Sequence, residues 1–480
     1  MFAALAVPNF RRYVSGQGLS LIGTWVETVA QALLVLRLTH SGIALGLVTA
    51  ARYAPILLLS PWAGLLVDRD DKRRVLLVTQ AGLALVSAIL GVCVLTGVVR
   101  LWQVVALAIA FGSLSAVDNP ARQAFVQEVV GHDLVRNAVT LNSTSVNVAR
   151  VIGPAIAAAL VSTIGIGWCF VVNAVSFGFV IASLLSLNTR ALHPIKPVPR
   201  APGELRDGLR YAVGVPDIIR PLLMMALVGT FAFEFEVSLP LLAEVTFHGT
   251  DTTYSWLLAA LGAGAVAGGL FVARSSVTGV RRLTAAALCF GVAVALVAVS
   301  PTLPCAVATC ALTGAASVAF LTTGNATVQL ASDPAYRGRV TALWSMGLVG
   351  STPIGSPLIG AISGIASPRY ALALGAVACL AAAVVGRWPA RRRAVDQRLK
   401  TSSCLLSGPR PRVRVAFGAP AVSALRAGLA MPNAGIWQRL PAGGWRRREA
   451  ASLGMAGQLG HPAVVVSGWR ARRTARWRCR

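Results

Sequence analysis

Charged side chains are scarce in this chain, and acidic ones are especially rare. Lys, Arg, Asp and Glu make up 13% of the 480 residues, and 17 residues are Asp or Glu, whereas 55% are hydrophobic. A typical soluble domain carries about 25% charged residues. The composition therefore excludes an ordinary soluble domain.

Residue types that bind metals and nucleotides are also few. The five His are scattered, and six of the eight Cys lie in or beside apolar stretches. No Gly-x4-Gly-Lys-Ser/Thr loop is present, which excludes ATP hydrolysis by this chain itself. Gly262-x-Gly264-x-x-Ala267 imitates a nucleotide fingerprint, but it lies in an apolar stretch where small residues let helices pack closely. We expect no metal site, disulfide framework or cofactor.

Twelve long apolar stretches fill most of the chain instead. A helix needs roughly 20 apolar residues to cross the hydrocarbon core of a bilayer, and each stretch is about that long. The predicted fold class is an all-α membrane protein with twelve transmembrane helices. The predicted spans are 13–38, 42–67, 75–98, 102–122, 138–162, 166–188, 220–246, 252–273, 283–300, 303–329, 340–363 and 369–387.

The basic residues between the spans fall on alternate sides. The start of the chain and the even-numbered gaps hold nineteen Lys and Arg, whereas the odd-numbered gaps hold three, Arg37, Arg100 and Arg369. Short basic loops stay in the cytoplasm, so both termini are expected there, in a multi-pass protein of the cell membrane. No cleavable signal peptide is apparent, because Arg11 and Arg12 precede a span that is too long for one.

A proline-rich polar segment divides the spans into two halves. Residues 1–188 and 220–388 hold six spans each, and 189–219 form a predicted cytoplasmic linker with a short amphipathic helix near 205–213. Asn119 and Gln123 recur 206 residues later as Asn325 and Gln329. The halves are therefore expected to be parallel repeats of six helices around a central site.

The last part of the chain differs in composition. Residues 389–480 hold nineteen basic and two acidic side chains, a net charge of +17 out of +27. Little apolar surface is available there, so disorder is expected. Contact with anionic lipid or RNA and a lack of any function are the alternatives for this tail. The basic loops account for the remaining charge, and no nucleic-acid partner is expected.

The gap after the second span resembles the signature loop of the major facilitator superfamily. Gly64, Asp68, Arg69 and Arg73 match its pattern, and the resemblance covers residues 9 to 388. It implies two six-helix bundles, the major facilitator fold, and a conformational latch between Asp68 and the start of the eleventh span. Asp71 stands where the family usually has Gly, so a different turn is expected.

Further motifs resemble the bacterial exporter branch that includes macrolide-efflux and enterobactin-exporter proteins. They are Asn9-Phe10-Arg11-Arg12-Tyr13, Gly23-Thr24-Trp25, Asp118-Asn119-Pro120-Ala121-Arg122, Arg150-Val151-Ile152-Gly153-Pro154 and Arg337-Gly338-Arg339. The resemblance implies export of a small molecule of the drug or siderophore class, with protons and the lipid bilayer as partners.

Two groups of site residues follow from this resemblance. Asp118, Arg122, Arg337 and Arg339 are predicted to form a cytoplasmic gate. Gly153 and Pro154 are similar to part of the fifth-span motif of drug–proton antiporters, although Ala157-Ala158 replaces its Gly-Gly.

Five charged residues lie deep within spans, namely Glu27, Arg52, Arg150, Glu234 and Glu236. Placing each charged side chain at the centre of a transmembrane helix costs on the order of 2.5–3.5 kcal/mol. We therefore expect these side chains to be paired or to face a water-filled cavity. Arg52 and Arg150 lie at mid-depth, within reach of a carboxylate in the first span.

Helical periodicity predicts which of these side chains face a cavity. Glu27 continues a polar stripe in the first span that would form a cavity wall. Glu234 shares a face with Thr230, whereas Glu236 lies about 200° round an unbroken helix, so Glu234 is predicted to face the cavity. The remaining cavity candidates are Gln17, Thr24 and Gln31.

These carboxylates suggest how transport could be driven. A carboxylate in low-dielectric surroundings binds a proton more tightly, and a nearby Arg opposes this. Our hypothesis is that Glu27 or Glu234, with Arg52 or Arg150, couples proton entry to substrate exit. Static ion pairs that fix helix packing are the alternative. Proton-coupled uptake and a non-transporting receptor with the same fold are the alternative functions, and the sequence leaves substrate and oligomeric state undefined.

Overall fold

The computed structural model describes residues 3–131, 134–193, 204–273, 278–333, 336–387, 437–439 and 445–447. Within these ranges, twelve helical segments are long and apolar enough to span a membrane. Residues 1–397 form one compact unit and residues 398–480 a second. The chain is therefore a nearly all-helical multi-pass membrane protein, which confirms the predicted fold class.

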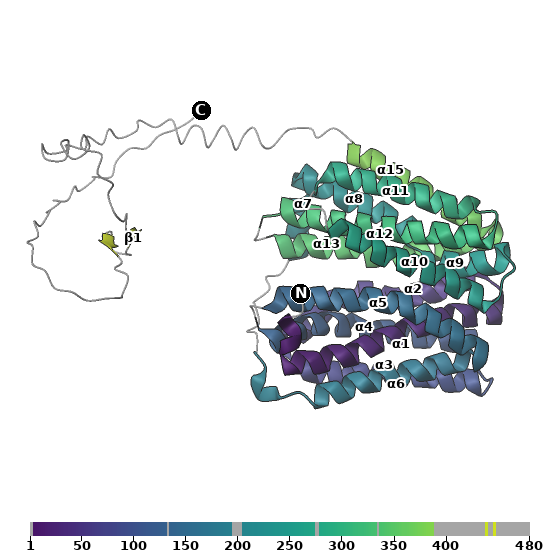
Figure 1. Ribbon diagram of the computed structural model, residues 1–480, viewed down its shortest axis with the longest axis horizontal. Coiled ribbons are helices and arrows are strands. Elements are labelled where there is room, and N and C mark those ends of the chain that lie inside the picture. The colour runs from purple at the N-terminus through teal and green to yellow at the C-terminus, as the bar shows by residue number, and fades with distance from the viewer. Residues whose placement is uncertain are drawn as a thin grey trace, which may run out of the picture. The chain divides into compact units, whose positions relative to one another are not determined.

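The N-terminal half of the first unit forms one group of helices. Figure 1 shows these helices, in purple and blue, packed side by side against the green C-terminal half. They are η1 (Ala3–Ala6), α1 (Pro8–Thr39), α2 (Gly42–Arg69), α3 (Lys72–Leu95), α4 (Leu101–Val130), α5 (Val135–Thr163) and α6 (Ile166–Leu185).

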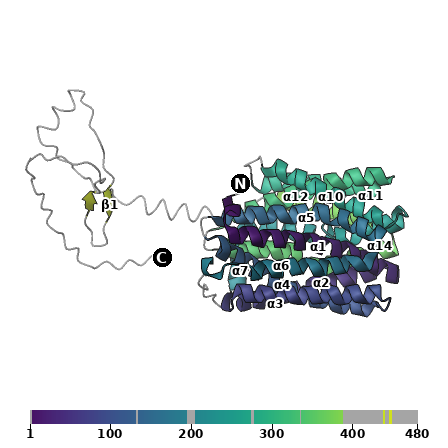
Figure 2. The same cartoon turned by 60° about the horizontal axis from the view of Figure 1, so that its bottom comes forward.

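The linker and the C-terminal half follow. The linker contains η3 (Thr189–Ala191) and α7 (Glu204–Gly214), where the sequence predicts an amphipathic helix. The C-terminal half consists of α8 (Pro216–Phe231), α9 (Phe235–Leu241), a π-helical turn η4 (Leu242–Thr246), α10 (Asp251–Ala273), α11 (Val280–Val299), α12 (Leu303–Ala331), α13 (Arg337–Val349), α14 (Thr352–Ile365) and α15 (Pro368–Arg387). The long helices run roughly parallel to one another in both views (Figure 1, Figure 2).

Two predicted spans are broken, and the prediction of continuous helices over 220–246 and 340–363 is wrong. The seventh span stops at Phe231 and resumes as α9 at Phe235. The eleventh span stops at Val349 and resumes as α14, with Pro353 in its first turn. Proline has no backbone N–H to donate, so it fits the first turn of a helix and interrupts a continuous one.

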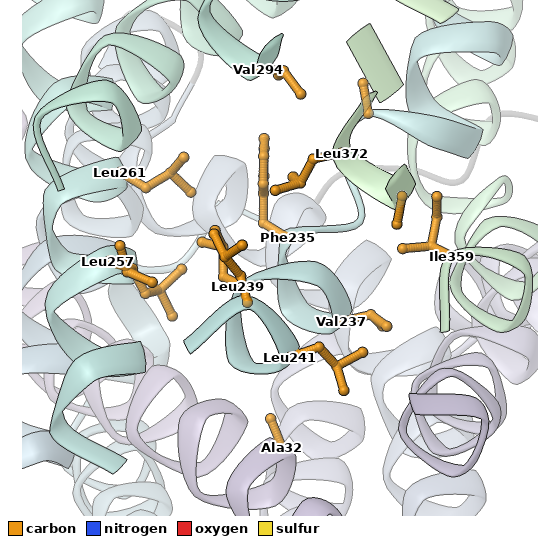
Figure 3. Close-up of a cluster of buried hydrophobic side chains, with 14 of the residues drawn as sticks. Ala32, Phe235, Val237, Leu239, Leu241, Leu257, Leu261, Val294, Ile359 and Leu372 are labelled. Carbon is orange, nitrogen blue, oxygen red and sulfur yellow. The ribbon is translucent and has the colours of Figure 1, made fainter. Parts of the chain in front are cut away.

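Apolar side chains hold the short helix α9 in place. Phe235, Val237, Leu239 and Leu241 are all buried. Figure 3 shows them surrounded by side chains of α1, α10, α11, α14 and α15, among them Leu257 of α10 and Ile359 of α14. A broken helix loses backbone hydrogen bonds, and the close packing of these side chains against neighbouring helices helps to offset that loss.

The two halves meet where α2 packs on α14 and α5 packs on α10. Small residues allow the close approach. A Cβ atom added to Gly46 would overlap the carbonyl of Ser356, and one added to Gly262 would lie 2.9 Å from the carbonyl oxygen of Arg150. Gly262 therefore serves helix packing, as expected for small residues in an apolar span.

Some contacts between the halves lie at the end of the unit opposite to the N-terminus. Gly42, at the start of α2, packs against the backbone of Gly360 in α14. His40, which follows α1, lies 3.4 Å from a carboxylate oxygen of Glu244 in η4. The other end, which holds the N-terminus and the basic loops, is called the basic end below.

The linker helix α7 docks on the C-terminal half at the basic end. The ring of Tyr211 stacks on that of Tyr336, with centroids 4.3 Å apart. The hydroxyl of Tyr211 also accepts a hydrogen bond of 3.1 Å from the backbone N–H of Asp333.

The second unit contributes one short hairpin to the described structure. Strand β1 (Trp437–Arg439) pairs antiparallel with β2 (Trp445–Arg447), with Gln438 opposite Arg446. The rest of the tail for which disorder is predicted lies outside the described residues.

We predict that replacing Gly314→Leu destabilises the protein. A Cβ atom at this position in α12 would overlap the carbonyl of Leu261 in α10, and overpacking of a tight contact costs about 1–3 kcal/mol. The expected result is a lower melting temperature of the purified protein. Gly178→Leu is the matched control, because a Cβ atom on Gly178 meets nothing within 4 Å. Equal melting temperatures for the two variants would contradict this account of α10 and α12.

Candidate functional site

A cavity between α1, α2 and α9 gathers polar side chains from both halves. Its volume of about 20 Å³ is enough for roughly one water molecule. The lining includes Gln31 of α1, Arg52 of α2 and Glu236 of α9. Of the cavity candidates predicted from the sequence, Gln31 lies in this lining.

Hydrogen bonds connect these side chains across the interface. The hydroxyl of Tyr53 donates a bond of 3.0 Å to Oε1 of Glu236, which joins α2 to α9. Nη1 of Arg52 donates a bond of 2.6 Å to Oε1 of Gln31, and its guanidinium lies 4.2 Å from the ring centroid of Phe111. We call Gln31, Arg52, Tyr53, Arg150 and Glu236 the interface cluster.

Arg150 completes this cluster from α5. Its guanidinium lies 5.1 Å from the ring centroid of Trp25, and Glu236 attracts it electrostatically. The Nε atom of Arg150 is buried and finds no acceptor among the described residues. Neither Arg150 nor Arg52 forms an ion pair within 4 Å of a described carboxylate, so the interface cluster is not a set of static salt bridges.

The prediction that Glu234 rather than Glu236 faces the cavity is wrong. Glu234 precedes α9 with φ −80° and ψ 45°, outside helical geometry, so the projection from a continuous helix fails there. The residue is 4% exposed and its carboxylate lies against α14, where Oε1 would be 2.9 Å from a Cβ on Gly355 and has no hydrogen-bond partner within the described part of the chain. Glu234 still lies close enough to Glu236 for the two charges to interact.

Glu27 lies inside the N-terminal half, away from the cavity. Its Oε2 accepts hydrogen bonds of 2.5 Å from Ser87 in α3 and 2.6 Å from Asn173 in α6. The side chain is 3% exposed. The structure therefore does not bring Glu27 together with Arg52, which bonds to Gln31 instead.

The other cavity candidates do not line the cavity either. Gln17 is buried, and neither side-chain polar atom has a hydrogen-bond partner within the described part of the chain. The hydroxyls of Thr24 and Thr230 donate to carbonyl oxygens one turn earlier in their own helices. The side chains of the polar stripe on α1 thus lie in different environments along the helix.

The four predicted gate residues are divided between the two halves. Asp118 of α4 is buried, and it accepts hydrogen bonds of 2.8 Å from Thr79 and Gln80 of α3 and one from Arg122, which lies one turn further along α4. Because α4 continues to Val130, Arg122, the last residue of the predicted span, lies well within the helix. Nothing in this arrangement crosses to the C-terminal half.

Arg337 and Arg339 lie in the first turn of α13 in the C-terminal half, and both contact residues of that half. Nε of Arg337 donates a bond of 3.1 Å to the carbonyl of Gln329. The guanidinium of Arg339 lies 5.3 Å from the ring centroid of Tyr336. The structure therefore does not bring the four gate residues together, and a joint gate stays a prediction.

Comparison with known proteins decides the family. The sequence profile described as "Transmembrane secretion effector", of the major facilitator superfamily, matches residues 1–417. The chain belongs to this family. Its members are transporters rather than enzymes, and the family implies a small-molecule substrate.

Curated relatives of this transporter family include efflux proteins. Multidrug efflux pump Tap of Mycobacterium tuberculosis is 27% identical over 73% of this chain and 87% of the pump. Enterobactin exporter EntS of Shigella boydii is 24% identical over 75% of this chain and 86% of the exporter. The staphyloferrin A transporter of Staphylococcus aureus is 34% identical over 37% of this chain.

The chain spans only part of the length of two of its relatives. The matched region spans 45% of the staphyloferrin A transporter and 65% of the transporter YfiS of Bacillus subtilis.

Solved structures of other transporters share the fold. A nucleoside transporter NupG variant gives a TM-score of 0.62 at 13% identity, covering 80% of this chain and 98% of NupG. A bacterial homologue of the lysosomal transporter Spinster, in an inward-facing conformation, gives 0.59 at 16% identity, covering 80% and 95%. These matches show the major facilitator fold.

The signature loop of this chain departs from the family pattern without strain. Asp71 has φ −64°, so the position does not require glycine, and its carboxylate caps α3 by accepting from the N–H groups of Arg73 and Arg74. Nε of Arg73 donates a bond of 2.8 Å to the carbonyl of Leu184. Gly64 is buried and Arg69 exposed. The side chain of Asp68 lies outside the described residues, so the latch stays a prediction.

The fifth-span motif of this chain packs α5 on α1. A Cβ atom on Gly153 would overlap the side chain of Trp25, the ring on which Arg150 rests. Pro154 follows within α5 and is buried. The motif therefore packs α5 against Trp25, whose ring lies beside Arg150 of the interface cluster.

We predict that Asp118→Asn destabilises the transporter strongly. Removing one partner of a buried ion pair leaves the charge of Arg122 uncompensated, at a cost of about 3–5 kcal/mol. The expected result is a lower melting temperature in detergent. Asp207→Asn, on an exposed side chain of α7, is the control and should leave it unchanged. Wild-type stability of the Asp118 variant would show that this pair is not structural.

Proposed function

We propose that this protein is a secondary transporter of the cell membrane that exports a hydrophobic or amphipathic small molecule of the drug or siderophore class. Proton entry drives export, and the two halves rock to expose the interface cluster alternately to each side. Both termini lie in the cytoplasm in this proposal.

The relatives support the direction of transport, and the loop charges support the orientation of the chain in the membrane. The relatives Tap and EntS are named as a multidrug efflux pump and an enterobactin exporter. The nineteen Lys and Arg against three in alternate gaps support cytoplasmic termini. The basic end is then the cytoplasmic end.

The interface cluster is the observation on which the coupling proposal rests. Tyr53 and Glu236 belong to different halves and share a hydrogen bond of 3.0 Å. Rocking of the halves would break this bond and move Glu236 away from Arg52 and Arg150. A carboxylate that loses its hydrogen-bond donor and its neighbouring positive charges binds a proton more readily. The reverse movement would release the proton, so Glu236 would carry one proton in each cycle.

Glu234 takes part in this coupling proposal through its closeness to Glu236, whereas Glu27 takes no part in coupling. Two carboxylates as close as Glu234 and Glu236 repel each other when both are ionised, so a proton on one favours the charge on the other. Glu27 is held by Ser87 and Asn173 within one half, so rocking leaves its surroundings unchanged.

We predict that Glu236→Gln abolishes the dependence of transport on a pH gradient, because glutamine cannot bind or release a proton. Measurement is by uptake of labelled substrate into proteoliposomes with and without an imposed gradient. Glu244→Gln is the matched control, since this carboxylate lies on the same segment but pairs with His40 at the surface. Full gradient dependence in the Glu236 variant would refute its coupling role.

We predict that Tyr53→Phe slows gradient-driven transport about ten-fold or more without abolishing coupling. A hydrogen bond to a charged group contributes about 1.5–3 kcal/mol, which shifts the balance between two conformations by that factor. Glu27→Gln should transport like the wild type. Loss of coupling in the Glu27 variant with normal coupling in the Glu236 variant would reverse the two assignments.

The function itself is tested with the purified wild-type protein in liposomes. A panel of antibiotics and siderophores is offered under a pH gradient of either sign, and an uncoupler is added in parallel. Export predicts movement of at least one compound against the direction of proton flow, stopped by the uncoupler. Movement with the proton flow would indicate uptake by symport. Failure to move any panel member would favour a receptor or scaffold.

A further inference from the structure

A second and larger cavity lies at the basic end of the C-terminal half. Its volume is about 550 Å³, within the range of small-molecule sites, and it is bounded by the ends of α8, α11, α12 and α15. Figure 1 shows these four helices within the C-terminal half. The charged residues of the lining are Asp217, Arg220 and Arg281. None of them belongs to the interface cluster.

The N-terminal half contains equivalent positions, and the side chains there make different contacts. Val7-Pro8-Asn9 and Arg12 recur 208 residues later as Val215-Pro216-Asp217 and Arg220, and Arg73 recurs as Arg281 at the same offset. The backbone repeats too, because His40 and His248, also 208 residues apart, have φ 48° and 46°. The two halves can therefore be compared residue by residue at this end.

The two arginines of the N-terminal half are bonded to the end of α6. Nη1 of Arg12 donates a bond of 2.8 Å to the carbonyl of Ser186, and Nε of Arg73 donates one of 2.8 Å to the carbonyl of Leu184. Helices α6 and α15 are both 20 residues long, so Leu184 corresponds to Gly386, which lines the cavity.

The corresponding arginines of the C-terminal half line the cavity, where Arg220 is partly buried and Arg281 is exposed. Nη2 of Arg220 is buried and has no hydrogen-bond partner in the described ranges. A buried charged donor without an acceptor is unfavourable, so an acceptor from outside the protein would be favourable here. Arg281 lines the same cavity.

The start of α11 lacks the carboxylate that its counterpart has. Asp71 caps α3 by accepting from the N–H groups of Arg73 and Arg74. Gly279 takes this position in α11, and it provides no side-chain cap. The first N–H groups of a helix favour a negative charge, and here they adjoin the cavity beside Arg281.

We propose that this cavity binds a phosphate group, held by Arg220, Arg281 and the start of α11. Arginine binds phosphate oxygens in pairs, and the anion would replace both the carbonyl oxygens and the carboxylate present in the N-terminal half. Because the cavity lies at helix ends, the headgroup of an anionic phospholipid can reach it, as can free phosphate. Asp217 opposes the anion and lowers its affinity.

The test measures ligand binding by the full-length protein purified in a neutral detergent. Melting temperature and native mass spectrometry are recorded with phosphatidylglycerol, with phosphatidylcholine and with inorganic phosphate. Arg220→Gln and Arg281→Gln should each weaken binding about ten-fold or more. Arg210→Gln, an exposed residue of α7 at the same end, is the control. Asp217→Asn should tighten binding and keeps both arginines, so it tests the site even if an arginine variant misfolds.

Three outcomes separate the possibilities. A response to phosphatidylglycerol that the arginine variants lose identifies the ligand as an anionic phospholipid. A response to inorganic phosphate alone, lost in the same variants, supports the same site with a free anion as its ligand. Equal binding by the wild type, both arginine variants and Asp217→Asn would overturn the proposal.

Discussion

The structure depends on one constraint, which is that a charged group cannot lie in the hydrocarbon core without a partner. The buried carboxylates of the two halves find their hydrogen-bond partners in different ways. Asp118 is satisfied by Thr79, Gln80 and Arg122 within the N-terminal half. Glu236, in contrast, takes its donor Tyr53 from the opposite half. A charge that needs the other half for its hydrogen bond is sensitive to any movement between the halves, and this makes the interface cluster suited to coupling.

The internal repeat explains how one architecture provides both stability and function. Positions 208 residues apart keep the same helix starts and the same positive φ values at His40 and His248. Their side-chain chemistry has diverged, however. Asp71 caps α3, whereas Gly279 leaves the start of α11 without a side-chain cap. At the basic end the N-terminal half thereby satisfies Arg12 and Arg73, whereas the C-terminal half keeps donors available.

Most of the fold could be predicted from sequence, because span length, loop charge and internal repeats are each visible in one chain. The breaks at Ala232–Glu234 and Gly350–Ser351 could not, since a continuous apolar run conceals them. Pro353 was the available signal for the second break. The error at Glu234 follows from that break, because helical projection needs a continuous helix. The bond between Tyr53 and Glu236 joins residues 183 positions apart, and no local pattern reveals it.

The central claim is that Glu236 gains and loses a proton as the halves move. The most direct measurement is infrared difference spectroscopy of the carboxyl groups in the purified protein as pH is lowered, for the wild type, Glu236→Gln and Glu27→Gln. The account predicts a protonated-carboxyl band that appears in the wild type and in the Glu27 variant and is missing in the Glu236 variant. A band that persists unchanged in the Glu236 variant would contradict it.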